Sequence, residues 1–395
     1  MKKMLSLAAM FAVLAYASPA SAEIKFGGDA SVRLRGQFED YDNGSAEDNE
    51  DDLNFAYRVR LKASADLGSG YFFKAMLTSD NAAGGWNTVS DNNREDGEID
   101  ISNFYFGRMM ENSHYMMGRL PLNSMNNPIF DLAMYPIPTS TGFGAIGIGD
   151  QPVGTYNMDR IFGLNYGTKI GDGELNGTLI VLDNDIKDDS VAEGDGLFND
   201  GYALHLSYKA NIGDVTVEPQ AIIALTDVDG IVYENVSPFV VGANVTIPAG
   251  KAKIGLSGFY TASDDDNATG FRPMTGDDPN TTTVESGTHK YLSRIGADVD
   301  YSGYLLRLKG QYEGFTAWVD YNHTDDNSRT SVKTADVDYD NLFVWAQYNY
   351  KVYESAMGSF SLTPTVRYWA LGSEVGSSET DYSRLRTELI ATVSF

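Results

Sequence analysis

The sequence contains no cysteine among its 395 residues. Such a chain can pass through an oxidising compartment such as the bacterial periplasm without forming disulfides, and it has no thiol at which a lipid could be attached. Histidine is scarce as well, and the four residues show no metal-binding spacing and no nucleophile-elbow context. We therefore expect no catalytic centre, no metal site and no cofactor. The histidines are His114, His205, His289 and His323.

Basic side chains are few compared with acidic ones. The chain has 29 Lys and Arg residues against 55 Asp and Glu residues, which gives a formal net charge of −26. A surface with this excess of negative charge repels phosphate groups instead of releasing counterions from them. The composition therefore argues against nucleic acid as a partner.

Long apolar runs are almost absent. One short run, Met4–Ala17, follows Lys2 and Lys3 and precedes the small residues Ala20-Ser21-Ala22. It is too short for a membrane-spanning helix, which needs about 20 residues, but it has the three parts of a secretory signal peptide. We predict that residues 1–22 are this signal and are removed before Glu23. Beyond it no segment approaches a helical span, so any membrane crossing has to be made by strands.

Strict alternation of apolar and polar residues is what the chain has in abundance. In 24–38 the even positions carry Ile, Phe, Val, Leu, Gly or Ala, and the odd positions are mostly charged or polar. In 53–67 the apolar residues take the odd positions instead. A period of two indicates a strand with one apolar and one polar face. Both segments exceed the roughly 9–11 residues with which a tilted strand crosses a membrane.

The alternation continues to the end of the chain. Long connections such as 40–52 and 80–98 alternate with short turns such as Gly68-Ser69-Gly70, as in bacterial membrane barrels. Ser302-Gly303 shifts the parity inside 289–312, which we interpret as a β-bulge in one long strand. We thus predict an all-β, transmembrane antiparallel barrel of 16 strands over residues 23–395. The further expected strands are 71–79, 98–109, 114–120, 158–170, 174–183, 201–211, 214–226, 236–247, 251–262, 289–312, 315–324, 339–352, 360–371 and 382–395.

The segment 120–157 breaks this period. Its prolines and its glycines between Gly142 and Gly149 are incompatible with barrel strands, and a loop of this length is usually functional or disordered. Its apolar content argues against disorder. Two arrangements are open: the loop folds into the barrel and packs on the inner wall, or it stays outside for subunit contact or surface display. We favour the first.

Two segments that precede 120–157 end in Gly-Arg, namely Phe104-Tyr105-Phe106-Gly107-Arg108 and Tyr115-Met116-Met117-Gly118-Arg119, and Met158-Asp159-Arg160 follows it. These segments resemble the strands that lead into and out of the constriction loop of Gram-negative general porins. The last strand ends on Phe395, which resembles the segment read by the barrel assembly machinery. The resemblance implies a trimeric outer-membrane channel with 120–157 as its constriction loop. The acidic sequence that is usual in the constriction loop of this family is missing, because Asp131 and Asp150 are the only acidic residues in 120–157.

Basic residues gather on the face that parity directs into the lumen. Because a closed barrel pairs its last strand with its first, these residues would form one basic wall facing Asp131 across the constriction. The alternative is local pairing of the arginines with Asp29, Asp66 and Glu388. Three tryptophans, Trp318, Trp345 and Trp369, also have lumen parity and could stack on sugars. The predicted pore-lining residues are Arg33, Arg35, Arg58, Arg60, Lys62, Lys74, Arg119, Asp131, Arg160, Arg384 and Arg386.

The resemblance and the basic wall together lead to a functional expectation. We expect an outer-membrane porin for passive diffusion of ions and small hydrophilic solutes, in contact with lipid and lipopolysaccharide. A channel selective for anions or sugars is the second reading, and an adhesin or structural barrel with a plugged lumen is the third. Solute-dependent block of the current would favour the second, and absence of current would favour the third.

Overall fold

A computed structural model describes most of the predicted barrel. The described residues are 24–42, 47–79, 86–89, 99–121, 127–129, 161–183, 201–225, 239–266, 298–327 and 336–395. The predicted signal peptide, residues 1–22, lies outside them, as does most of 120–157. Within the described part, no helix combines the length and apolar character that crossing a membrane requires.

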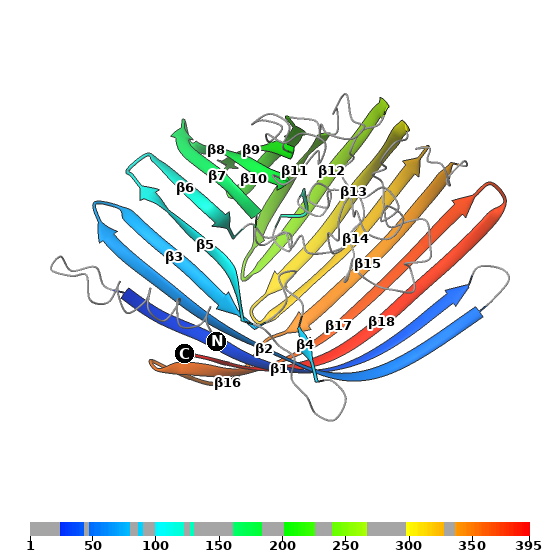
Figure 1. Ribbon diagram of the computed structural model, residues 1–395, viewed down its shortest axis with the longest axis horizontal. Coiled ribbons are helices and arrows are strands. Elements are labelled where there is room, and N and C mark those ends of the chain that lie inside the picture. The colour runs from blue at the N-terminus through cyan, green and yellow to red at the C-terminus, as the bar shows by residue number, and fades with distance from the viewer. Residues whose placement is uncertain are drawn as a thin grey trace, which may run out of the picture.

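The described chain consists of antiparallel strands that form one sheet (Figure 1). β3 and β4 both pair with β2, and β15 and β16 both pair with β17, so each couple takes one place in the wall. The wall therefore has the predicted sixteen strands. The strands are β1 Ile24–Asp42, β2 Glu47–Gly68, β3 Tyr71–Thr78, β4 Asn87–Thr88, β5 Asp100–Met109, β6 Ser113–Leu120, β7 Ile161–Ile170, β8 Gly173–Asp183, β9 Gly201–Ile212, β10 Val215–Ala224, β11 Phe239–Ala249, β12 Ala252–Asp266, β13 Asp298–Tyr312, β14 Phe315–Asp326, β15 Val337–Tyr348, β16 Tyr350–Ser355, β17 Gly358–Val375 and β18 Ser378–Ser394.

The barrel is closed by its two terminal strands. β1 pairs with β18 over the whole run from Asp29–Ser394 to Asp42–Asp381, and it pairs with β2 on its other side. At the very end, Phe395 and Gly28 exchange two backbone hydrogen bonds of 2.9 and 3.0 Å. Residues about 350 positions apart in the sequence thus become neighbours, which confirms the closure on which the predicted basic wall depends.

The two faces of the wall are opposite in character. On β1, the apolar side chains Val32 and Leu34 are about 40% exposed, whereas Arg33 is 4% and Arg35 is 9% exposed. A soluble barrel would bury the apolar set, because burial of apolar area drives folding in water. Here the apolar set faces outward on strand after strand. The alternation in the sequence therefore corresponds to an apolar outer face, which is suited to lipid, and a polar inner face.

The connections follow the predicted alternation of lengths, with two exceptions. The predicted long connection 40–52 is wrong, because β1 and β2 pair as far as Asp42–Glu47 and leave only 43–46 between them. Tight turns such as Gly68-Ser69-Gly70, where all three residues have positive φ, join strands at the end that holds Phe395. At the opposite end β17 and β18 also meet in a tight turn, at Gly376 with φ of 64°. The sequence had placed a longer connection, 372–381, there. Pairing from Ser373–Thr380 to Val375–Ser378 extends both strands instead.

The predicted bulge at Ser302-Gly303 is wrong. β13 is one strand as expected, but its partners run without a break on both sides, including Ser302–Asp325 and Gly303–Thr324. Parity seemed to slip because Leu305, an apolar residue, lies on the inner face, where it is fully buried.

Candidate functional site

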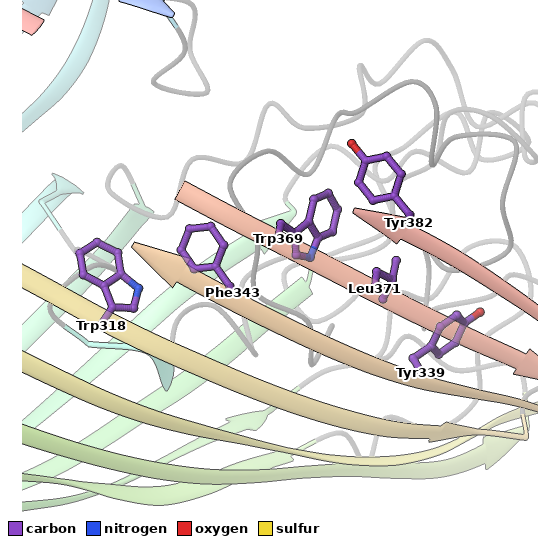
Figure 2. Packing of buried hydrophobic residues seen from close by; sticks show 6 residues of the cluster. All are labelled: Trp318, Tyr339, Phe343, Trp369, Leu371 and Tyr382. Atoms are coloured by element: carbon purple, nitrogen blue, oxygen red, sulfur yellow. The ribbon is translucent and has the colours of Figure 1, made fainter. Parts of the chain in front are cut away.

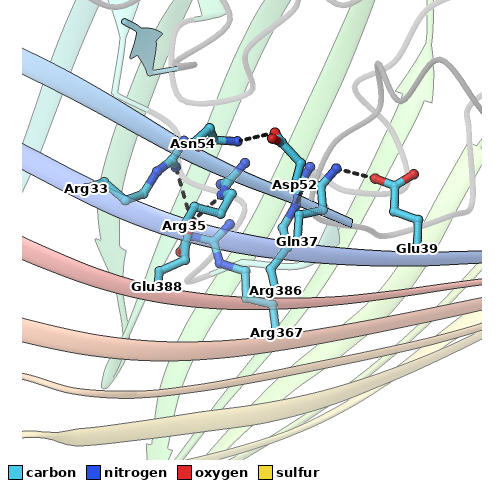
Figure 3. Close-up of polar contacts among 9 residues, drawn as sticks. All are labelled: Arg33, Arg35, Gln37, Glu39, Asp52, Asn54, Arg367, Arg386 and Glu388. Atoms are coloured by element: carbon cyan, nitrogen blue, oxygen red, sulfur yellow. Dashed lines mark hydrogen bonds and ion pairs between the residues drawn. The ribbon is translucent and has the colours of Figure 1, made fainter. Parts of the chain in front are cut away.

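Three arginines converge on one carboxylate inside the barrel (Figure 3). Glu388 of β18 receives Arg35 Nε at 2.6 Å, Arg33 Nη1 at 3.3 Å and Arg367 Nη2 at 2.8 Å. The arginines come from β1 and β17, which flank β18, so closure of the barrel creates the cluster. Both parts of the sequence prediction are present, since Arg33 and Arg35 do line the wall and do pair with Glu388.

Two further arginines of β18 extend this cluster towards the end of the barrel opposite Phe395. Arg386 donates from Nε to Gln37 on β1, and Arg384 is buried with its guanidinium 5.0 Å from the centre of the Trp369 ring. Arg58 of β2 lies 4.6 Å from the centre of the Trp86 ring. We call Arg33, Arg35, Arg58, Arg367, Arg384 and Arg386 the arginine wall.

Basic residues nearer the Phe395 end of the barrel follow the local-pairing alternative. Arg60 Nε is 2.8 Å and Lys62 Nζ is 3.4 Å from the carboxylate of Asp29. Lys74 is exposed and lies over the Phe72 ring at 5.7 Å. Lys62 and Lys74 share the lining of a cavity of about 450 Å³ with Lys25, Tyr105 and Asn103. Arg60, Lys62 and Lys74 therefore lie on the inner face of the barrel.

Arg119 was predicted to line the pore, and this prediction is wrong. Its cross-strand partners are Phe104 and Phe162, and its guanidinium lies 5.6 Å from the centre of the Phe162 ring on the outer face. The guanidinium also donates to the backbone oxygen of Ile101 at 2.8 Å. An arginine on an apolar face directs its polar head to a nearby acceptor while its stem stays on the aromatic surface. Asp131 and Arg160 lie outside the described residues.

A row of aromatic and basic side chains crosses the inner wall next to the arginine wall. Lys309 pairs with Trp318, Trp318 with Trp345, and Trp345 with Arg367. The two indoles stack with centroids 4.6 Å apart, and the Arg367 guanidinium lies 3.6 Å from the Trp345 ring centre. Cations are attracted to the negative faces of such rings. The lumen parity of these tryptophans is confirmed.

The same strands carry an apolar cluster on their inner face. Figure 2 shows its six members, and Trp345 packs against them. Trp318 and Trp369 are only 3% and 2% exposed, and the indole of Trp369 donates to Asn341. A ring with covered faces cannot stack on a passing sugar, so the structure gives no support to the sugar-platform reading. The members are Trp318, Tyr339, Phe343, Trp369, Leu371 and Tyr382.

Two residues of this site were missed in the sequence. Arg367 could have been found, because it lies in the same alternating strand as Trp369 and shares its parity. Trp86 could not have been found in this way, because it lies inside the predicted loop 80–98. The structure shows that residues after Trp86 pair with β2, through Asn87–Tyr57 and Thr88–Ala56. This pairing brings the indole to Arg33, 4.5 Å from the ring centre, and to Arg58.

The described part of 120–157 beyond Leu120 and Pro121 is Asn127–Ile129, and it touches the wall opposite the arginines. Asn127 exchanges two hydrogen bonds with Gln220 of β10, at 2.7 and 3.0 Å, and accepts a third from Asn244 of β11 at 3.0 Å. Both partners lie on the inner face, and Gln220 also contacts His205 at 2.9 Å. Ile129 is fully buried. Asn127–Ile129 therefore lie inside the barrel.

Among the buried side chains of β1, β2, β17 and β18, arginines outnumber acids by five to two, and the half-buried Glu39 is the cross-strand partner of Arg384. Of the two buried acids on these strands, Asp29 is engaged by Arg60 and Lys62, and Glu388 is shared by three arginines. Buried cations without an equal number of fixed anions favour mobile anions nearby. Among the described residues, no group of three potential ligands is arranged to hold a metal ion.

A closed barrel of sixteen antiparallel strands, apolar outside and polar inside, is the architecture of Gram-negative outer-membrane porins. No family model and no curated protein sequence matches the chain. Among solved structures, OpdL of Pseudomonas aeruginosa aligns over 94% of this chain and 99% of its own, with 12% identity and a TM-score of 0.50. An anion-selective porin from Comamonas acidovorans aligns over 95% and 100%, with 13% identity and a TM-score of 0.49. At such identities the likeness to OpdL shows a common fold.

Proposed function

We propose that this protein is an outer-membrane diffusion channel for small hydrophilic solutes whose arginine wall favours anions. The observation that carries the proposal is the excess of buried arginines over buried acids on the side of the lumen formed by β1, β2, β17 and β18, which come from both ends of the chain. A one-sided field in a narrow polar passage attracts counter-ions and orients polar solutes. The apolar outer face is suited to lipid, and the polar inner face is suited to water.

Location and assembly belong to the same proposal. The signal peptide 1–22 would direct export, and Phe395 at the seam of the barrel would be read by the assembly machinery of the outer membrane. We propose a homotrimer from the porin resemblance, with lipid and lipopolysaccharide around it. Segment 120–157 would act as the constriction loop, which is supported by the position of Asn127–Ile129 on the inner wall.

The test is single-channel current of the purified protein in a planar bilayer under a salt gradient. We expect steady current steps, closing in threes for a trimer, and a reversal potential of the sign given by anion preference. A cation-selective current would overturn the role of the arginine wall. Absence of current from correctly folded protein would overturn the channel itself and favour a structural or adhesive barrel.

A channel with a preferred anionic substrate is the second candidate. The grouping of Arg33, Arg35 and Arg367 around one carboxylate favours it, because cations held close together in the low-dielectric wall attract an anion more strongly than separate hydrated cations do. Saturation of the current by one organic anion, at concentrations where chloride current is still linear, would distinguish this candidate from a general porin.

A further inference from the structure

We propose that Trp86 is a specificity-determining residue of the channel: its indole covers Arg33 and Arg58 and limits how strongly the arginine wall attracts anions. The inference rests on the proposed function. It concerns a residue outside every sequence motif, in a short segment that returns to the barrel wall after β3. Both guanidiniums lie over this one ring, at 4.5 and 4.6 Å from its centre.

The position of Trp86 follows from backbone pairing. Asn87 pairs with Tyr57 and Thr88 with Ala56, and the Val89 amide donates to the Phe55 oxygen at 3.0 Å. Continuing this register by one residue places Trp86 beside Arg58. Arg58 points into the lumen, as Trp86 therefore does, while Val89 is exposed on the outer side. The indole is thus presented to the arginines by the wall itself.

Ala56 provides the space for this contact. It is the cross-strand partner of Arg33 on one side and of Thr88 on the other. Its side chain faces inward and is fully buried. A larger residue would fill the space between Arg33 and the indole, whereas a single methyl group lets the ring reach across from β4 to β1.

The contact has an electrostatic effect that bulk alone would not have. Arg33 and Arg58 are like charges on adjacent strands, and Arg33 already shares Glu388 with two other arginines. The negative face of an indole attracts a guanidinium without neutralising it. Trp86 therefore holds two cations in place and removes part of their surface from anions in the lumen.

The test compares variants at this position in bilayers under a salt gradient, with the wild type measured alongside. For Trp86→Ala we expect larger conductance and an anion-to-cation permeability ratio raised about twofold or more, because the cation–π contacts that cover the two guanidiniums are lost. Trp86→Leu, which keeps apolar bulk without a π face, should shift the permeability ratio in the same direction. Trp86→Phe should stay near the wild type.

Two further variants make the outcome decisive. Val89→Ala changes the same segment on its outer side and should leave selectivity unchanged. Ala56→Val should displace the indole and raise the permeability ratio as Trp86→Ala does. An unchanged or lower ratio in Trp86→Ala, or a Leu variant identical to the wild type, would overturn the inference while leaving the channel intact. A wild type that does not conduct would overturn the proposed function and this inference with it.

Discussion

Lumen charge is set by single residues, and the structure separates those that add to the arginine wall from those that balance it. Arg58 lies over Trp86, and Arg60 is paired with Asp29 at 2.8 Å. Replacing both with serine removes two positive charges from the lumen and leaves the Asp29 carboxylate with Lys62 alone. The double variant should therefore shift the permeability ratio towards cations about two- to fivefold, the size expected for charges acting through several ångströms of water.

The matched control for this double variant is Lys351→Ser. Lys351 is also ion-paired, to Glu354 at 2.9 Å, but it lies on the exposed hairpin of β16. Its removal should leave the reversal potential in the salt gradient as it is. An unchanged reversal potential in Arg58→Ser/Arg60→Ser would show that these arginines do not set selectivity.

Glu388 makes the opposite contribution to the wall. Its carboxylate is fully buried and contacts three arginines. Glu388→Gln should raise anion preference, because one negative charge is lost from a positive wall. It should also destabilise the barrel by about 3 kcal/mol, since removing one partner leaves buried charges uncompensated. Thermal unfolding followed by circular dichroism measures the second effect, and Glu388→Asp keeps the charge as a control. A variant with wild-type stability would show that Glu388 is not needed to hold the arginines.

The sequence revealed most of the lumen residues in regular strands, although Arg367 was overlooked, and it could not reveal Trp86, whose position depends on tertiary pairing. Parity gave Arg33, Arg35, Arg384 and Arg386 correctly, because a strand alternates its side chains regardless of its neighbours. Arg119 was assigned to the pore because it flanks the loop and not by parity, and the structure places it on the outer face.

Strands could be predicted where the period of two extends over many residues, and they could not be predicted where the paired segment has only a few residues. Sixteen strands and their closure follow from the alternation, whereas β4 has only two residues and forms because β2 has an unpaired edge beyond the end of β3. The tight turn at Gly376 was missed because Gly372 to Thr380 contains few apolar residues. At the end of the barrel opposite Phe395, strand length is set by backbone pairing, and the hydropathy pattern does not report this pairing.

Asn127 contacts the inner wall through hydrogen bonds whose role can be tested. Asn127→Ala removes three hydrogen bonds to Gln220 and Asn244, each worth about 1 kcal/mol. If this contact holds the constriction loop, the variant should show noisier current and more frequent transitions between conductance levels. Asn112→Ala, in the exposed turn between β5 and β6, is the control. Open-channel noise identical to the wild type would contradict a holding role for Asn127.

The whole molecule depends on the seam between β1 and β18, where the chain ends. Phe395 hydrogen-bonds to Gly28 through its backbone alone, and its ring is exposed on the outside. Phe395→Ala therefore keeps the seam bonds and loses the ring. We expect the purified variant to refold in detergent with nearly wild-type thermal stability.

In cells the same variant should reach the outer membrane in a much smaller amount, because an exposed ring that adds little to stability is available for recognition by the assembly machinery. The measurement is the amount of folded protein in outer-membrane fractions beside the refolding yield in detergent. Equal loss in both would assign Phe395 to stability alone, and no loss in either would remove the terminal aromatic ring from the account of assembly. A loss confined to cells would show that the Phe395 ring is needed for assembly of the barrel in the membrane and not for the stability of the folded protein.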